Sequence, residues 1–270
     1  MYTDFRKDIV DSGIMSKVEI IPVGAPLGAG NLVPAYSRDG STSVVELGDN
    51  TNEANVETAV TTPQFTMLGV SFRDMLVGAL VAVGKDDMLP VLTGIKFEWS
   101  DSEITVITTD RYRMAIGVTR KESYAVTVSE GGFLLPRTVA AELIKVLPKK
   151  TSWNNSEHDM ITVVLVGRDM VTIEYGDPGE RIVRPVRTLD GEFPKWRSLV
   201  PTDDMLSQGS VTFASYNPAY LADVAKIPHW KDAPVRFRFT TNLKPAMIDY
   251  VDAHNGVKWD YLLMPVRLTN

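Results

Sequence analysis

The residues best suited to catalysis are few and lie far apart in the sequence. Three histidines occur, at positions 158, 229 and 254, and the sequence contains no GxSxG or HExxH motif. The histidines are too scattered to suggest a metal cluster. Cysteine is absent, which excludes a thiolate nucleophile, a thiolate zinc site and a disulfide framework. These observations predict a binding protein rather than an enzyme.

Two pairs of adjacent carboxylates, Asp86–Asp87 and Asp203–Asp204, remain as candidates for acid–base or metal chemistry. Neighbouring residues of a strand do not converge on one ion, and helix capping or a solvated loop explains such pairs better. A hydrolase that uses Asp203 and Asp204 is therefore the least favoured alternative. The glycine-rich stretch Gly24–Gly30 lacks the GK[ST] ending of a P-loop and the spacing of a dinucleotide fingerprint. We expect a turn there and no cofactor.

The composition is that of a soluble globular protein. The 270 residues are 44% apolar and 23% charged, and the length predicts about two domains. Lys and Arg number 28 against 34 Asp and Glu, so any nucleic acid must be met by a local basic surface. The longest helix-compatible apolar run, Met75–Gly84, has ten residues, whereas a membrane span needs about 20. We expect a cytoplasmic protein without a membrane partner.

The first 63 residues differ in composition from the rest of the chain. They are rich in Gly, Pro, Ser, Thr and Asn, with short apolar pieces at Val18–Val23 and Val44–Leu47. We expect loops with a few strands, and a linker at about Asp49–Pro63. A short helix at Thr3–Met15 is disfavoured by Gly13 and by mixed periodicity.

From about residue 64 a unit recurs three times. Each copy begins with a short apolar strand, continues with a capped amphipathic helix and ends with three alternating strands. The helices are predicted to begin at Ser71 as N-cap, at Pro136 in the first turn, and at Asn217 as N-cap with Pro218 following. The predicted strands are 64–69, 95–99, 103–109 and 112–118, then 131–135, 160–166, 170–176 and 181–189, then 210–215, 235–241, 245–251 and 259–268.

One such unit is too small to bury its own apolar face, but two units side by side share a core under two helices. The pattern therefore predicts an α+β fold of repeated βαβββ units, with the helices on one face of curved antiparallel sheets. Strand edges left open at the ends of such domains favour edge-to-edge assembly, and closed rotational symmetry would then give a ring.

Several segments of this repeated part occur in the order known from one family. They are GKDDMLPVLTGIKFEWSDSEITVITTDRYRMAIGV (84–118), FLLPRTVAAELIKVL (133–147), RTLDGEFPKWRSLVP (187–201), FASYNPAYLADVAKI, RFRFTTNLKPAMI and DYLLMPVRL. The sequence resembles the bacterial DNA polymerase III beta sliding clamp family over about residues 64–270. The resemblance implies a complete domain at 64–200, like the family's middle domain, and half a domain at 201–270, like the end of its last domain. Residues 1–63 would be a diverged half domain or an unrelated arm.

The resemblance also implies a peptide pocket between the middle and last domains, where family members dock linear motifs. Apolar side chains from three distant segments can line such a cleft, with Arg113 and Arg267 as charged donors at its rim. Strand alternation predicts that every second residue of Leu262–Val266 faces the cleft. The matching positions are Leu92, Thr109, Tyr112, Arg113, Met114, Pro194, Ser198, Leu199, Leu262, Met264, Pro265, Val266, Arg267 and Leu268.

In the family, helices line a central hole and present basic residues to the DNA. Arg137 and Lys145 are eight residues apart, so they project within about 80° of each other on one helix. Encirclement retains a clamp on DNA with few, weak phosphate contacts, which is compatible with an acidic protein. The implied DNA-facing residues are Arg73, Lys85, Arg137, Lys145 and Lys149.

The function implied by the resemblance is that of a DNA sliding clamp, a polymerase processivity factor. Its partners would be duplex DNA, a DNA polymerase and other clamp-motif proteins, a clamp loader, and further copies of the chain. Two domains per chain would place six in a trimer, which favours a trimeric over a dimeric ring. Such a compact form suits a phage or mobile-element version. The alternative is a non-encircling regulator or decoy that binds replication proteins or a host clamp.

Overall fold

The computed structural model describes residues 31–36, 42–47, 59–61, 63–119, 124–126, 130–149, 160–166, 169–176, 181–207, 214–250, 252 and 254–266. The chain divides into two units, Met1–Thr62 and Pro63–Asn270, and each is described by itself. Several predictions lie outside the described residues: Thr3–Met15, Val18–Val23, Gly24–Gly30, most of the predicted strand 210–215, and the pocket residues Arg267 and Leu268.

The described part of the first unit is a three-stranded sheet in the order β1-β2-β3. β1 (Asn31–Tyr36) and β2 (Thr42–Leu47) pair antiparallel along their full lengths, and β3 (Ala59–Thr61) pairs with the start of β2. The predicted strand Val44–Leu47 is confirmed within β2. The predicted linker was wrong for residues 59–61, because this run with β-branched Val60 and Thr61 adds a third strand to the sheet.

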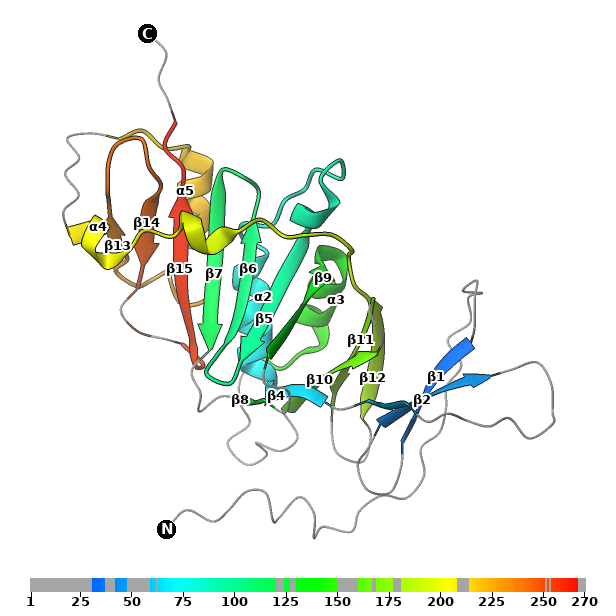
Figure 1. The fold of residues 1–270 in the computed structure, drawn as a ribbon. Helices are drawn as coiled ribbons and strands as arrows, with labels where there is room; N and C mark the ends of the chain where they lie inside the picture. Colours follow the sequence, from blue (N-terminus) through cyan, green and yellow to red (C-terminus); the bar gives the residue numbers. More distant parts are fainter. Residues whose placement is uncertain are drawn as a thin grey trace, which may run out of the picture. The chain divides into compact units, whose positions relative to one another are not determined.

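The second unit contains two antiparallel sheets (Figure 1). The five-stranded sheet has the order β12-β11-β10-β4-β8, and its strands are β4 (Pro63–Leu68), β8 (Tyr124–Val126), β10 (Met160–Val166), β11 (Met170–Tyr175) and β12 (Ile182–Arg187). The seven-stranded sheet has the order β13-β14-β15-β7-β6-β5-β9. Its strands are β5 (Gly94–Ser100), β6 (Ile104–Thr109), β7 (Arg113–Thr119), β9 (Glu130–Pro136), β13 (Arg236–Arg238), β14 (Ala246–Asp249) and β15 (Val257–Leu263).

The helices begin close to where the sequence predicts. They are α2 (Gly69–Ala79), α3 (Arg137–Val146), α4 (Asp203–Ser207) and α5 (Pro218–Val224), with short 3-10 helices η1 (Pro90–Thr93) and η3 (Trp196–Leu199). Asn217 is confirmed as the N-cap of α5, since its side chain accepts a hydrogen bond from the Ala219 amide. Ser71 was wrong as a cap. It lies inside α2, where its hydroxyl donates to the Asn255 carbonyl oxygen at 2.6 Å.

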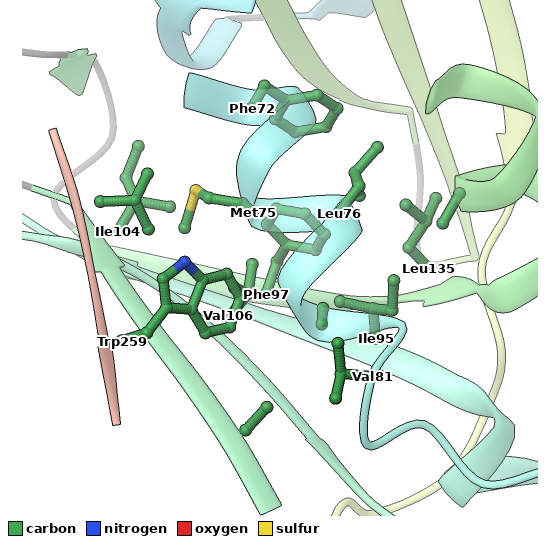
Figure 2. Close-up of a cluster of buried hydrophobic side chains, with 14 of the residues drawn as sticks. Phe72, Met75, Leu76, Val81, Ile95, Phe97, Ile104, Val106, Leu135 and Trp259 are labelled. Carbon is green, nitrogen blue, oxygen red and sulfur yellow. The ribbon is translucent and has the colours of Figure 1, made fainter. Parts of the chain in front are cut away.

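One hydrophobic core joins α2 and α3 to both sheets. On α2, Phe72, Met75 and Leu76 follow the i, i+3, i+4 spacing of a buried helix stripe, and Phe72 stacks on Phe97 of β5 with the ring centroids 5.5 Å apart (Figure 2). β15 contributes Trp259, which is 3% exposed. The α+β prediction, with helices against antiparallel sheets, is confirmed.

Trp259 lies in a slot whose walls are glycines. A β-carbon at Gly117 of β7 would stand 2.8 Å from the indole ring, and one at Gly78 of α2 would overlap the same ring. The indole therefore packs directly against the backbone of a helix on one side and of a neighbouring strand on the other. This contact joins β15 to α2 and β7, which lie far upstream in the sequence.

None of the helices in the described ranges combines the length and the apolar character that a membrane crossing requires.

Candidate peptide-binding site and basic helix residues

The candidate peptide site forms where β15 pairs with β7. The antiparallel ladder runs from Val257 opposite Thr119 to Leu263 opposite Arg113. Beyond the ladder, the Met264 amide donates to the Tyr112 carbonyl at 2.9 Å. The turn before β7 and the segment after β15 therefore lie side by side, although the sequence separates them by about 150 positions.

A network of hydrogen bonds fixes the turn before β7. One carboxylate oxygen of Asp110 accepts from the amides of Tyr112 and Arg113, both at 3.0 Å. The Thr109 hydroxyl donates to the Arg113 carbonyl at 2.7 Å and accepts from the Arg111 amide at 3.1 Å. Arg111 itself has a φ of 80°, in the left-handed region. With its polar groups satisfied internally, the turn holds the Tyr112 ring outward, where it is 54% exposed.

Arg113 links this turn to α5. Its guanidinium pairs with Asp110 at 2.9 Å and with Asp223, and it lies 4.4 Å from the centre of the Tyr220 ring. Burial alone would lower the pKa of Arg113, but its hydrogen bonds to Asp223, Tyr261 and Asp110 outweigh burial and raise it. The charge of Arg113 is thus engaged within the protein, where it positions α5 and the Tyr220 ring beside Tyr112.

This arrangement shifts the pKa values of Tyr261 and Asp223. Burial raises the pKa of Tyr261 to about 12, although Arg113 acts in the opposite direction. For Asp223, burial favours a higher pKa, but hydrogen bonds from Lys226 and Arg113 lower it below its usual value. Asp223 is therefore a permanent anion between two cations near neutral pH.

The floor of the candidate site is a small apolar cluster on the sheet face opposite to the main core. Met114 and Leu262 are cross-strand partners and are 4% and 3% exposed. They share the cluster with Phe193, and Trp196 of η3 packs against it. Three distant segments of the chain, namely the start of β7, the end of β15 and the stretch around η3, therefore share one apolar cluster.

Above this floor, four predicted pocket residues expose apolar surface: Tyr112, Leu199, Met264 and Val266. Met264 is 40% and Val266 46% exposed, and the Val266 amide donates to the Ser215 carbonyl at 2.7 Å. The others differ in exposure: Pro194 and Ser198 are exposed, Leu92 and Pro265 are half-buried, and Thr109 is buried. The Ser198 hydroxyl donates to the Lys195 carbonyl at 2.7 Å.

Sequence reasoning missed Tyr220 and Asp223 at this site. Both lie on α5 at i and i+3, so helical spacing already places them on one face. The sequence analysis also did not predict a shallow cavity of about 530 Å³ over β5, which is lined in part by Lys96, Glu98 and Glu130. Arg197 of η3 lines this cavity as well and pairs with Glu98 at 2.8 Å. The apolar residues at the end of β15 do not line it.

The predicted DNA-facing residues divide into two groups. Arg73, 19% exposed, donates to the Ile144 carbonyl of α3 at 3.3 Å. Arg137 donates to the Gly84 carbonyl at 3.1 Å and pairs with Asp87 at 3.2 Å. Both arginines are thus engaged between elements of the protein. The exposed group consists of Lys85, Lys145 and Lys149.

Two of the three histidines are in contact. The rings of His229 and His254 stack with their centroids 2.9 Å apart, and the Nδ1 of His254 lies 3.3 Å from a carboxylate oxygen of Asp74. The expectation that the histidines are too scattered to form a cluster was wrong for this pair. The fold brings together the loop after α5 and the turn before β15, which linear spacing does not reveal.

The sequence comparisons with known proteins agree on one class of protein. A family model described as the DNA polymerase III beta subunit, central domain, matches residues 68–195. The beta sliding clamp of Streptomyces coelicolor is 24% identical over 76% of this chain and 66% of its own length. The beta sliding clamp of Micrococcus luteus is 32% identical over 52% of this chain and 41% of its own length. The chain therefore spans less than two thirds of either relative.

Solved structures agree at the level of the fold. A sliding clamp from Bacillus subtilis has a TM-score of 0.59 and 15% identity, covering 88% of this chain and 75% of that one. The DNA polymerase III beta subunit of Thermotoga maritima gives 0.60 and 17%, covering 87% and 76%. The fold is that of a DNA clamp. The match of residues 68–195 to the family's central domain, together with the two beta sliding clamps, supports the resemblance to the bacterial DNA polymerase III beta sliding clamp family found in the sequence.

Proposed function

We propose that the chain acts as a DNA sliding clamp. Its copies join edge to edge into a ring around duplex DNA, and the surface around Met264 holds the linear motif of a polymerase. The role needs no catalysed reaction, because the clamp keeps the polymerase near its template by topology. One observation carries the proposal most strongly: the turn at Thr109–Arg113, η3 and the segment after β15 converge on one apolar cluster with exposed apolar residues above it.

This site suits a short, partly apolar peptide. Met114 and Leu262 supply a buried floor, while Tyr112 and Met264 offer exposed apolar contact area joined by a backbone hydrogen bond. Aromatic and methionine side chains are enriched at the cores of protein interfaces, and a small number of anchors usually carry most of the binding energy. Carrying the family's motif pocket onto these residues is therefore physically reasonable.

A fluorescence titration with a labelled clamp-motif peptide tests the site. Met264→Ala should weaken binding about tenfold, which corresponds to about 1.4 kcal/mol. Deleting Met264–Asn270 should abolish binding while the far-UV circular dichroism spectrum stays unchanged. Met88→Ala is the matched control, since Met88 is 87% exposed and is not among the predicted pocket residues. Unchanged affinity of the Met264 variant would count against the peptide site.

For DNA, the proposal rests on the exposed lysines rather than on Arg73 and Arg137, whose guanidinium groups are bonded within the protein. Changing Lys85, Lys145 and Lys149 together to Glu should reduce retention on nicked circular DNA. The control changes three other exposed lysines, Lys231, Lys244 and Lys258, to Glu and alters the net charge equally. Equal loss in both triple variants would remove the first group from the proposed DNA-facing surface.

The assembly is tested by light scattering of the purified protein. A trimer is expected if each chain supplies two domains of a six-domain ring, and a dimer would still be compatible with a ring of another domain count. A stable monomer at micromolar concentration would instead favour the non-encircling regulator or decoy. In that case the peptide titration should still succeed while retention on circular DNA fails, which separates the two functions.

A further inference from the structure

Three side chains with metal-binding chemistry meet on the helix side of the seven-stranded sheet. Asp74 belongs to α2, His229 to the loop after α5, and His254 to the turn before β15. One ligand atom from each residue lies within 4.8 Å of the other two. The three residues come from parts of the chain separated by up to 180 positions, so tertiary folding alone brings them together.

One of the three distances already matches the dimensions of a zinc site, and all three ligand atoms lie within 4.8 Å of one another. Two ligand atoms at about 2.05 Å from a tetrahedral ion are separated by about 3.3 Å. The Asp74 carboxylate oxygen and the His254 Nδ1 are already 3.3 Å apart. His229 is exposed, so a rotation of its side chain can bring its ring nitrogen to the same separation.

The carboxylate is held by outer partners in the way that metal ligands usually are. The Asn255 side-chain amide donates to the Asp74 carboxylate at 2.6 Å, and the Ser71 hydroxyl fixes Asn255 through its carbonyl, also at 2.6 Å. Asp74 is only 6% exposed, and Arg73 approaches its carboxylate no closer than 3.9 Å. A buried carboxylate with such a distant cation is one that a bound cation would stabilise.

The backbone beside the cluster is unusual as well. His229 has a φ of 66° and Asn255 a φ of 47°, both in the left-handed region that residues with a side chain seldom adopt. Such conformations cost free energy and persist where the surrounding structure requires them, often at binding sites. Here they direct His229 and the turn around His254 toward Asp74.

We propose that Asp74, His229 and His254 bind a divalent transition-metal ion, zinc in the first place. Two imidazoles and one carboxylate form a ligand set that zinc accepts, with water as the fourth ligand. The ion would tie α2 to the loop after α5 and to the turn before β15. It would thereby brace the strand whose end carries Met264, independently of whether the protein encircles DNA.

Zinc titration of the chelator-treated full chain, against a chromophoric competitor, tests this proposal. We expect one zinc per chain, and His229→Ala should weaken binding at least tenfold. His229 is exposed, so this variant should fold normally, which makes it the decisive one. Asn255→Ala should weaken binding less, since it removes an outer partner rather than a ligand. Asp252→Asn, which changes a neighbouring exposed carboxylate, is the control and should bind as the parent does.

Two further readouts do not depend on competition. Cobalt(II) should give visible absorption bands typical of a tetrahedral N/O site, and His229→Ala and His254→Ala should abolish them. Zinc should raise the melting temperature of the parent protein and leave that of His229→Ala unchanged. Absence of zinc binding at millimolar concentration, or binding that His229→Ala leaves intact, would overturn the proposal and leave Asp74 and His254 as a simple hydrogen-bonded pair.

Discussion

Replacing Gly78 with Ala should destabilise the protein, although Gly78 lies in a helix. In an isolated helix this change would be favourable by about 1 kcal/mol. Here the new methyl group would overlap the Trp259 indole, and the ring cannot retreat because the backbone of Gly117 stands against it on β7. Overpacking a close-packed core costs about 1–3 kcal/mol. With the upper end of that range, the net loss is about 2 kcal/mol.

Urea denaturation followed by far-UV circular dichroism measures this loss, and a thermal scan should show a fall of roughly 4–8 °C for a unit of this size. The control is the same substitution in a Trp259→Phe background, where the smaller ring lacks the indole atoms that the methyl group would overlap. In that background Gly78→Ala should become neutral or stabilising, because only the helix propensity remains. If Gly78→Ala stabilises the parent protein, the packing of Trp259 against α2 is refuted.

The remaining predictions concern the anchorage of α5. Arg113→Met should cost about 3 kcal/mol in urea unfolding, because it leaves Asp110 and Asp223 without their buried partner, and a cost under about 1 kcal/mol would contradict the role of Arg113. The pKa of Asp223 is lower in the folded state than in the unfolded state. The ionised carboxylate therefore adds to the free energy of unfolding above its unfolded pKa of about 3.9, and this stabilisation is lost as the pH falls through the folded-state pKa. Below about pH 4, Asp223→Asn should therefore lose stability less steeply than the parent, and parallel pH profiles would argue against this. Asn217→Ala should cost about 1 kcal/mol through the lost cap of α5, and an equal loss in Asn217→Asp, which retains the cap, would point elsewhere.

Most of the fold could be predicted from patterns among nearby residues. Alternation in residues 95–99 reflects burial of one face of β5, and the helical spacing of apolar residues in α2 reflects its packing against the core; both are properties of nearby residues. Nearly every residue of β6 and β7 is buried, which alternation alone does not indicate. The order of strand, helix and three strands is present in the first two copies, from β4 to β7 and from β9 to β12. β8 was not predicted, because three residues are too few to show a period.

The site was harder to predict, because partners distant in sequence decide what a side chain does. Helical spacing predicted that Arg137 and Lys145 project from similar sides of α3. It could not indicate that Arg137 donates to the Gly84 carbonyl. Arg73 likewise meets a carbonyl of another helix. The meeting of His229 with His254 depends on two loops whose conformations include positive φ angles. None of these contacts leaves a signal in the spacing of residue types.

The position of β15 also bears on how the protein is made. β15 is the last described strand in the sequence, yet it lies between β7 and β14, and its end pairs with a residue 150 positions earlier (Figure 1). During translation, β7 leaves the ribosome with one hydrogen-bonding edge open until β15 has been synthesised. An open edge can recruit strands from other nascent chains. Ribosomes stalled before Val257 should therefore yield a product that aggregates or recruits chaperones, whereas the finished polypeptide closes the gap itself.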